Sequence, residues 1–207
     1  MKSALLKAEF NSHKLILEQI IQESGKLISD LAICLVDCFQ KGHKIMLCGN
    51  GGIASDAQHV AAEFINRFRF DRPALPAIAL TTDTSILTAI GNDSSFDFVF
   101  SRQVEAMAVK GDILVGISTS GRSANVLKAL DTARTKGATT VGFTGEKGRK
   151  AIGAKCDYCL VIPSADTARI QECHEFVWHI VCGIVENKLF GQPHTAQSGE
   201  KYELAFI

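Results

Sequence analysis

Histidine and carboxylate side chains occur in this sequence at spacings that suit acid–base or metal chemistry. His59 and Glu63 are four residues apart in a segment with helical character, so both side chains would face one side of a helix. Such a pair can exchange protons with a substrate or share a metal ion. An ordinary ion pair on the protein surface is the alternative explanation.

A second group of polar side chains lies near the start of the long apolar segment 167–190. Its members are Arg169, Gln171, Glu172, His174, Glu175 and His179. His179 lies among apolar residues, so taken alone it would be explained as a core histidine. If this segment meets the one that holds His59, the two histidines and their neighbouring donors would form a metal or acid–base site.

Residues 117–123 read Ile-Ser-Thr-Ser-Gly-Arg-Ser and lie between an apolar run and a helix-forming run. Hydroxyl groups and the backbone N–H groups at a helix start can bind a phosphate. The lysine that nucleotide-binding P-loops need is missing, which favours a phosphorylated sugar or a similar small molecule over ATP. The alternative is a serine-rich cap that serves only the helix.

Alternating strands and helices must position these groups. Apolar runs predict strands over 44–48, 77–80, 113–117, 139–144 and 158–162. Helices are predicted over 2–24, 26–41, 54–67, 83–90, 96–109, 124–136 and 167–190, with a turn at 91–93. The pattern predicts an α/β fold, with a five-stranded parallel sheet between two layers of helices and two further helices at the N-terminus. The loops after the first and third strands would lie at the carboxyl edge, where such sheets bind ligands.

Composition narrows the possible partners. Lysine plus arginine and aspartate plus glutamate number 22 each, and aromatic residues make up 7% of the chain. We therefore expect no nucleic-acid partner and no membrane partner. Seven cysteines without a secretion signal indicate reduced thiols in the cytoplasm. Cys156 and Cys159 form a C-x-x-C on a predicted strand, where their side chains would face opposite sides and hold no metal or disulfide.

Five short motifs occur in an order that resembles the phosphoheptose isomerases, a family with the sugar-isomerase (SIS) fold. They are Cys48-Gly49-Asn50-Gly51-Gly52, then Asp56-Ala57-Gln58-His59 with Glu63, then Gly91-Asn92-Asp93, Ser118-Thr119-Ser120-Gly121 and Arg169-Ile170-Gln171-Glu172. The resemblance covers residues 1–190. It implies one SIS domain, made of an N-terminal helical pair over 1–41 and an α/β core over 42–190. Residues 191–207 would form a loose tail.

The resemblance also implies an activity and a site. It implies that sedoheptulose 7-phosphate is converted to D-glycero-D-manno-heptose 7-phosphate, a precursor of ADP- or GDP-heptose, in a cytoplasmic homotetramer with active sites at subunit interfaces. One zinc ion per subunit is implied at His59, Glu63, Gln171 and His179. The implied substrate contacts are Asn50, Gly51, Gly52, Glu63, Asn92, Asp93, Ser118, Thr119, Ser120, Ser123 and Gln171. We expect Glu63 to be the base at carbon and His179 its acid–base partner.

Three points stay open at this stage. Gln171 and His179 are separated by about 12 Å along an ideal helix, and spacing alone pairs Gln171 with His174 or Glu175. A carboxylate bound to zinc is a poor base, so either Glu63 changes its coordination during turnover or the metal is structural or activating. Ile53 stands where relatives often have serine.

Other functions on the same fold are alternatives. One is a non-catalytic regulator that binds the replication initiator, a relative that lacks counterparts of Glu63 and His179. Another is an isomerase for a pentose or hexose phosphate, against which the Arg169-to-Glu172 motif argues. A sugar-phosphate sensor would need a DNA-binding domain, which the sequence does not contain.

Overall fold

Five parallel strands form the centre of the molecule, in the order β2-β1-β3-β4-β5. The strands are β1 (Ile45–Cys48), β2 (Ala77–Ala79), β3 (Ile113–Ser118), β4 (Thr139–Gly145) and β5 (Tyr158–Ile162). The computed structural model describes residues 2–191. Because the chain moves from β1 to one edge strand and then returns to β3, the strand order reverses between β1 and β3. A crevice for a ligand is expected at the carboxyl ends of these two strands.

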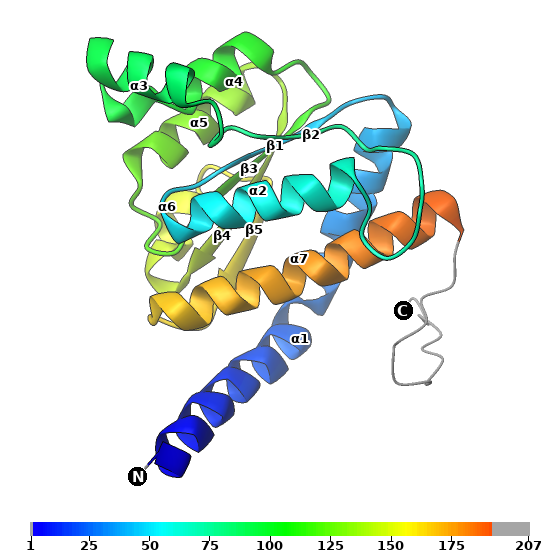
Figure 1. Ribbon diagram of the computed structural model, residues 1–207, viewed down its shortest axis with the longest axis vertical. Coiled ribbons are helices and arrows are strands. Elements are labelled where there is room, and N and C mark those ends of the chain that lie inside the picture. The colour runs from blue at the N-terminus through cyan, green and yellow to red at the C-terminus, as the bar shows by residue number, and fades with distance from the viewer. Residues whose placement is uncertain (1, 192–207) are drawn as a thin grey trace.

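Helices cover both faces of the sheet, which confirms the predicted three-layer architecture (Figure 1). One face carries α1 (Lys2–Gln40), α2 (Gly52–Ile65) and α7 (Thr167–Phe190). The other carries α3 (Thr84–Asp93), the 3-10 turn η1 (Phe96–Phe98), α4 (Ser101–Met107), α5 (Ala124–Thr135) and α6 (Arg149–Gly153), which follows a second 3-10 turn, η2 (Glu146–Gly148).

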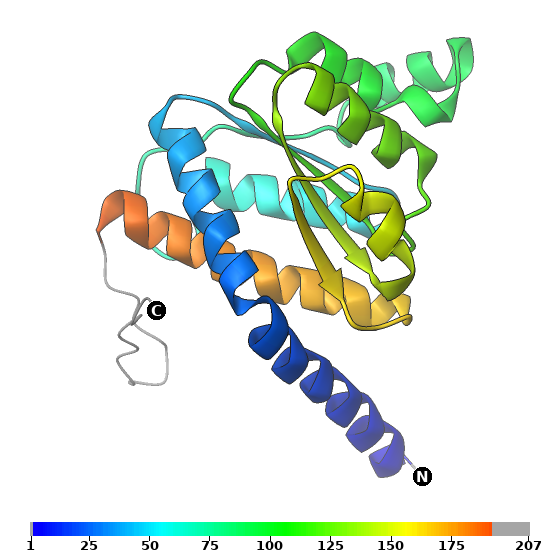
Figure 2. The ribbon, with the colours of Figure 1, turned by 180° about the vertical axis from the view of Figure 1, so that it is seen from behind.

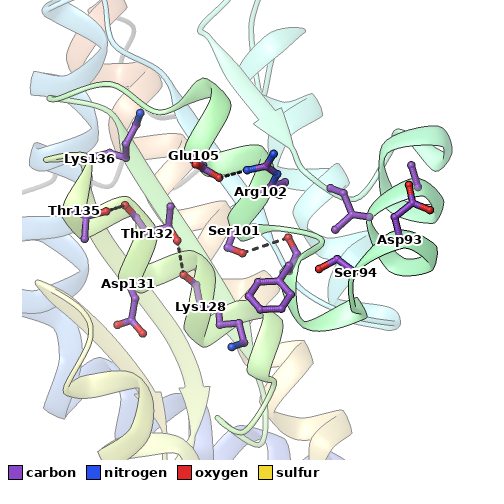
Figure 3. A pocket seen from close by; sticks show the side chains of 13 residues that line it. Asp93, Ser94, Ser101, Arg102, Glu105, Lys128, Asp131, Thr132, Thr135 and Lys136 are labelled. Atoms are coloured by element: carbon purple, nitrogen blue, oxygen red, sulfur yellow. Dashed lines mark hydrogen bonds and ion pairs between the residues drawn. The ribbon is translucent and has the colours of Figure 1, made fainter.

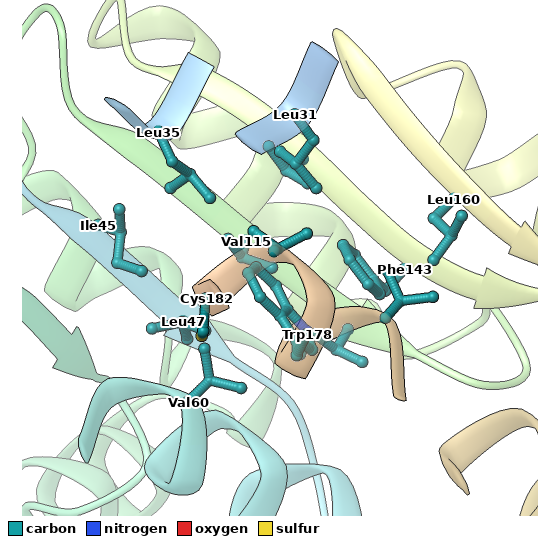
Figure 4. Packing of buried hydrophobic residues seen from close by; sticks show 14 of the residues in the cluster. Leu31, Leu35, Ile45, Leu47, Val60, Val115, Phe143, Leu160, Trp178 and Cys182 are labelled. Atoms are coloured by element: carbon teal, nitrogen blue, oxygen red, sulfur yellow. The ribbon is translucent and has the colours of Figure 1, made fainter. Parts of the chain in front are cut away.

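The alternation of side chains along the strands separates two apolar cores. In β1, Ile45 and Leu47 face α1, α2 and α7, whereas Met46 and Cys48 face α4 and α5. Trp178 of α7 is completely buried in the first core and stacks on Phe143 of β4 (Figure 4). This packing holds α7 against the centre of the sheet.

The two N-terminal helices expected over 2–24 and 26–41 are one continuous helix, α1. Gly25 was expected to break it, but a single glycine costs only about 1 kcal/mol in a helix. The second half of α1 packs on β5 and α7, Glu9 and His13 still contact the start of α7, and the N-terminal end projects from the body (Figure 2). Leu5, Leu6 and Phe10 on the projecting part are 64–70% exposed.

Other boundaries differ slightly from those expected. Residues 91–93 continue α3 instead of forming a turn, and the helix expected over 96–109 is divided into η1 and α4. Ser95 caps the start of η1, because its side chain accepts a hydrogen bond from the Asp97 N–H. Cys156 and Cys159 pack against the same core, not on opposite sides as expected, because Cys156 precedes the strand.

The predicted loose tail, apart from Gly191, lies outside the described residues. Within residues 2–191, no helix has the length and apolar character that crossing a membrane requires.

Candidate active site

The two histidines singled out from the sequence meet where α2 packs on α7. The Nε2 atoms of His59 and His179 are 3.0 Å apart, and their rings are oriented edge to face. Phe68 stacks on the other side of the His179 ring. His59 and His179 are each close to half exposed, so the junction is open to small molecules.

Two carboxylates lie beside the histidines. Glu175 Oε2 is 3.5 Å from His59 Nε2 and 4.0 Å from His179 Nε2. Glu63 Oε1 lies 3.6 Å from His59 Nε2. The donor atoms of His59, Glu175 and His179 all lie within 4.8 Å of one another, which is a spacing that one metal ion could bridge. The other oxygen of Glu175 is buried and has no hydrogen-bond partner among the described residues.

The environment changes the proton affinity of this group. Burial lowers the pKa of His179, and neighbouring His59 and Arg69 lower it further, while Glu63 opposes the shift. Burial raises the pKa of Glu175, with added repulsion from Asp56 and Glu63 and an opposing effect of His59. A neutral imidazole keeps the lone pair that a metal or a proton requires.

A buried ion pair fixes α2 relative to α7. The side chains of Arg72 and Glu186 are 1% and 2% exposed, and Arg72 Nε donates to Glu186 at 3.1 Å. The same guanidinium donates to the backbone carbonyls of Glu63 and Phe64 in the last turn of α2. Glu186 also accepts the backbone N–H groups of Phe68 and Arg69. No short motif marks this pair, because its members are separated by more than a hundred residues.

Gln171, an implied metal ligand and substrate contact, lies against Asp56 and the loop after β1. Its Nε2 donates to Asp56 Oδ1 at 2.7 Å, and its amide packs so closely on Gly52 that a Cβ at position 52 would lie 2.9 Å from it. Gln171 therefore faces the loop after β1. This position suits the substrate contact implied for Gln171, and its implied role as a metal ligand stays a prediction.

The loop after β1 approaches the loop after β3. Asn50 and Asn125 exchange two side-chain hydrogen bonds of 2.9 Å, and Gly51 has a φ of 62°, which favours glycine. These contacts join the expected substrate residues Asn50, Gly51 and Gly52 to the start of α5. Asn125 was not predicted, because an asparagine in the first turn of a helix has no distinctive sequence signal. Ile53 is buried in the first core, and its side chain packs against Gly49 at the start of this loop.

The serine-rich loop is arranged as a cradle and not as a helix cap. Ser123 precedes α5 but makes no capping bond with its side chain; its Oγ lies 2.9 Å from Ser118 Oγ. The Thr119 carbonyl accepts the Gly145 N–H, and Gly121 packs on Gly148 with no space for a Cβ between them. The Val126 N–H donates to Asn125 Oδ1, so the Ala124 and Asn125 N–H groups are those of the first turn of α5 that could bind an anion.

A small cavity of about 130 Å³ opens between the serine-rich loop and the start of α7. Its lining residues are Thr119, Ser120, Arg122, Lys147, Ser164, Ala165, Thr167 and Ile170. Hydroxyl groups with two basic side chains suit a phosphate. Lys147 was not predicted, since it lies after β4 and reaches this loop only through the order of the strands.

Within one chain, Asn92 and Asp93 lie away from the histidine junction and from the serine-rich loop. They form the last turn of α3, where Asn92 Nδ2 donates to Asp93 Oδ1. Asp93 lines a wide cavity of about 1070 Å³ between α3, α4 and α5 (Figure 3). Because α3 packs on the face of the sheet opposite α7, these residues are separated from the histidine junction.

His174 is also separated from the junction, although it was one sequence-based alternative for a partner of Gln171. It is completely buried and lies edge to face against Phe143. Burial lowers its pKa to about 4, and the nearby Thr144 backbone offsets only part of this, since neither ring nitrogen makes a regular hydrogen bond within residues 2–191. His174 belongs to the core.

Comparisons with known proteins agree over nearly the whole chain. Residues 10–145 match the family described as the SIS domain. The chain is 49% identical over 187 residues to a phosphoheptose isomerase of Aneurinibacillus thermoaerophilus, covering 89% of this chain and 94% of that protein. A phosphoheptose isomerase structure from Neisseria gonorrhoeae is 40% identical, with a TM-score of 0.84 and coverage of 90% of this chain and 100% of that one. One from Francisella tularensis is 33% identical, with a TM-score of 0.86 and coverage of 90% and 99%.

Proposed function

The chain belongs to the SIS-domain proteins and, among them, to the phosphoheptose isomerases, and on this basis we propose that it interconverts sedoheptulose 7-phosphate and D-glycero-D-manno-heptose 7-phosphate. It is an aldose–ketose isomerase. Its product would supply the synthesis of ADP- or GDP-activated heptose.

The junction of α2 and α7 is the observation that carries this function. It gathers two histidines and two carboxylates where α2 packs on α7. The cavity beside the serine-rich loop lies at the start of the same α7, and Ile170 of its lining precedes His179 by a rise of about 13 Å. An open-chain sugar with seven carbons and a terminal phosphate has a comparable length. Its carbonyl end can therefore meet the histidines while its phosphate is held at the loop.

The chemistry moves one proton between neighbouring carbons through an enediol. We assign Glu63 as the base at carbon, because its carboxylate lies beside His59 and carries no lysine or arginine partner among the described residues. His179 acts at the substrate oxygens, either by moving protons or by holding an ion there. Ser118, Thr119, Ser120 and Ser123 bind the phosphate, which fixes the position of the reacting carbons.

The junction also suits a divalent metal, which we propose to be one zinc ion per subunit. The resemblance assigns its donors to His59, Glu63, Gln171 and His179, of which the two histidines already converge. The buried, unpartnered oxygen of Glu175 indicates that a cation fits at this place. When bound, zinc would polarise the substrate carbonyl and stabilise the negative charge that develops on its oxygen.

We further propose a homotetramer with active sites between subunits, in the cytoplasm. The exposed apolar residues on the projecting part of α1 support an oligomer, since single chains seldom leave such a row uncovered. The separation of Asn92 and Asp93 from α7 supports a site completed by a second subunit. Seven free cysteines favour a reducing compartment.

The test is isomerisation of sedoheptulose 7-phosphate by the purified protein, with and without zinc, beside Glu63→Gln. We expect turnover by the wild type and a loss of about a hundredfold or more in kcat for the variant. If Glu63→Gln matches the wild-type rate, Glu63 is not the base. No turnover from a folded oligomer would indicate the initiator-binding regulator or an isomerase for another sugar phosphate.

A further inference from the structure

We propose that Asn125 is a positioning residue for Asn50. It holds the Asn50 amide in one orientation, and in that orientation Asn50 offers one N–H and one oxygen lone pair to hydroxyl groups of the sugar. This inference rests on the proposed function, because Asn50 is one of the residues expected to bind the sugar phosphate.

Asn125 is held at a fixed place in the fold. It is the second residue of α5, and it is only 3% exposed. The start of α5 packs on β3 at Gly116, where an added Cβ would lie 2.9 Å from Val126 Cγ1 and 3.0 Å from Leu130 Cγ. Such close packing leaves the start of the helix little room to move. Asn125 is therefore a rigid reference point for the loop beside it.

A backbone group of α5 decides which way the Asn125 amide points. The Val126 N–H donates to this side chain at 2.9 Å. Because an N–H can only donate, the side-chain atom that receives it is the oxygen, Oδ1, and the nitrogen occupies the other branch of the amide. Turning the amide over would place two donors against each other and lose this bond. The helix thus selects one of the two amide orientations.

This selection passes directly to Asn50. Asn50 Nδ2 donates to Asn125 Oδ1, and Asn125 Nδ2 donates to Asn50 Oδ1, both at 2.9 Å. Turning over the Asn50 amide alone would bring oxygen against oxygen and nitrogen against nitrogen, so both bonds would be lost. A primary amide has two N–H donors and two acceptor lone pairs, and the pair uses one of each. Within residues 2–191 the Asn50 side chain makes no other hydrogen bond, so one donor and one acceptor remain.

The two remaining groups of Asn50 suit the hydroxyls of a sugar. A hydroxyl can both donate and accept, so neighbouring hydroxyls can bond to the N–H and to the oxygen of one amide. Asn50 is half-buried and follows β1, which pairs with β3, so it lies at the same edge of the sheet as the serine-rich loop. Because Asn125 is more deeply buried, contact with the sugar falls to Asn50. An amide that is already held in place binds without first losing its rotational freedom.

Two ligands separate the sugar part of binding from the phosphate part. Calorimetry would measure the affinity of the purified protein for inorganic phosphate and for the open-chain heptitol phosphate made by reducing sedoheptulose 7-phosphate, which cannot isomerise. Turnover of sedoheptulose 7-phosphate would be assayed in parallel. The variants are Asn50→Ala, Asn125→Ala and Asn125→Asp, with each Asn125 change also made in the Asn50→Ala background. Thr135→Ala is the control, because Thr135 is exposed at the far end of α5, where it donates to the Thr132 carbonyl.

We expect Asn125→Ala to weaken heptitol phosphate binding about tenfold and to change phosphate binding less than about twofold. In the Asn50→Ala background the same change should cost less than about twofold, because no amide is left to orient. Asn125→Asp keeps the side-chain volume and the bond from the Val126 N–H but removes the donor to Asn50. Its added charge acts on both ligands, so the ratio of the two affinities reports the lost hydrogen bond. Thr135→Ala should bind both ligands as the wild type does.

Thermal unfolding checks that each variant is folded, and Asn125→Asp decides the matter if Asn125→Ala is not. Equal losses with and without Asn50 would overturn the inference, as would unchanged heptitol phosphate binding in both Asn125 variants. A parallel loss of both ligands would also overturn it, because Asn125 would then serve only the phosphate cradle. So would a wild type that binds heptitol phosphate no better than phosphate. If binding behaves as expected but the wild type isomerises no sedoheptulose 7-phosphate, the inference stands and the proposed function fails.

Discussion

Replacing Arg72 by methionine tests whether the clamp between α2 and α7 holds the fold together. Methionine keeps an apolar stem of similar length but removes the guanidinium. Glu186 would then stay buried with only the N–H groups of Phe68 and Arg69 as partners. The carbonyls of Glu63 and Phe64 would lose the donors that complete the last turn of α2.

The expected loss of unfolding free energy is about 3–5 kcal/mol, the usual result of removing one member of a buried ion pair. Urea unfolding at one fixed protein concentration measures it, because an oligomer's stability depends on concentration. Trp178 of α7 is the single tryptophan and is completely buried in the core. Its fluorescence therefore reports the unfolding transition.

Two further variants make this result decisive. Arg67→Met removes the exposed partner of Asp71 and should cost less than about 1 kcal/mol. Adding Glu186→Leu to Arg72→Met should recover part of the loss, because no uncompensated charge then remains buried. If Arg72→Met costs no more than Arg67→Met, the clamp does not stabilise the protein and the reasoning is refuted.

Two other predictions concern the phosphate cradle and the acid side of the stability curve. Ser120→Ala should raise KM for sedoheptulose 7-phosphate about tenfold or more, through loss of a hydrogen bond to a charged group; an unchanged KM would remove Ser120 from the cradle. Asp112 is buried, which opposes its ionisation, but hydrogen bonds from Lys44 and from the Val109 N–H hold its pKa below the usual range. The stability from this ionised group is present above the unfolded pKa of about 4 and is lost as pH falls through the lower folded pKa. Asp112→Asn should therefore lower stability at pH 7 by about 2–3 kcal/mol and flatten acid unfolding, as measured by denaturation at several pH values; an unaltered acid profile would contradict this assignment.

Much of the fold followed from local patterns. The five strands were predicted because each is a short apolar run bounded by polar or small residues, and α7 was predicted with its observed bounds. The break expected at Gly25 was wrong because packing of α1 on α7 and β5 outweighs the weak preference of one glycine. The end of α3 was also missed: Gly91-Asn92-Asp93 favours a turn locally, but these residues continue the helix.

The site was harder to predict from the sequence than the fold, because it depends on which residues of two helices lie opposite each other. Spacing could place His59 with Glu63 and Glu175 with His179, since each pair lies on one helix. It could not show that Asp56 faces Gln171, or that Arg72 lies against Glu186. Those contacts join segments more than a hundred residues apart, and only the packing of α2 on α7 brings them together.

That packing explains why Glu175 and not Gln171 stands at the histidines. The two helices run side by side in the same direction (Figure 1), with Asp56 opposite Gln171 at one end and the Arg72–Glu186 pair at the other. His59, one turn after Asp56, therefore lies opposite residues one to two turns after Gln171. For Gln171 to stand opposite His59, α7 would have to slide by about 6 Å, the rise of four residues. Such a slide would break both end contacts, so the register of the helices determines which residues of α7 face His59.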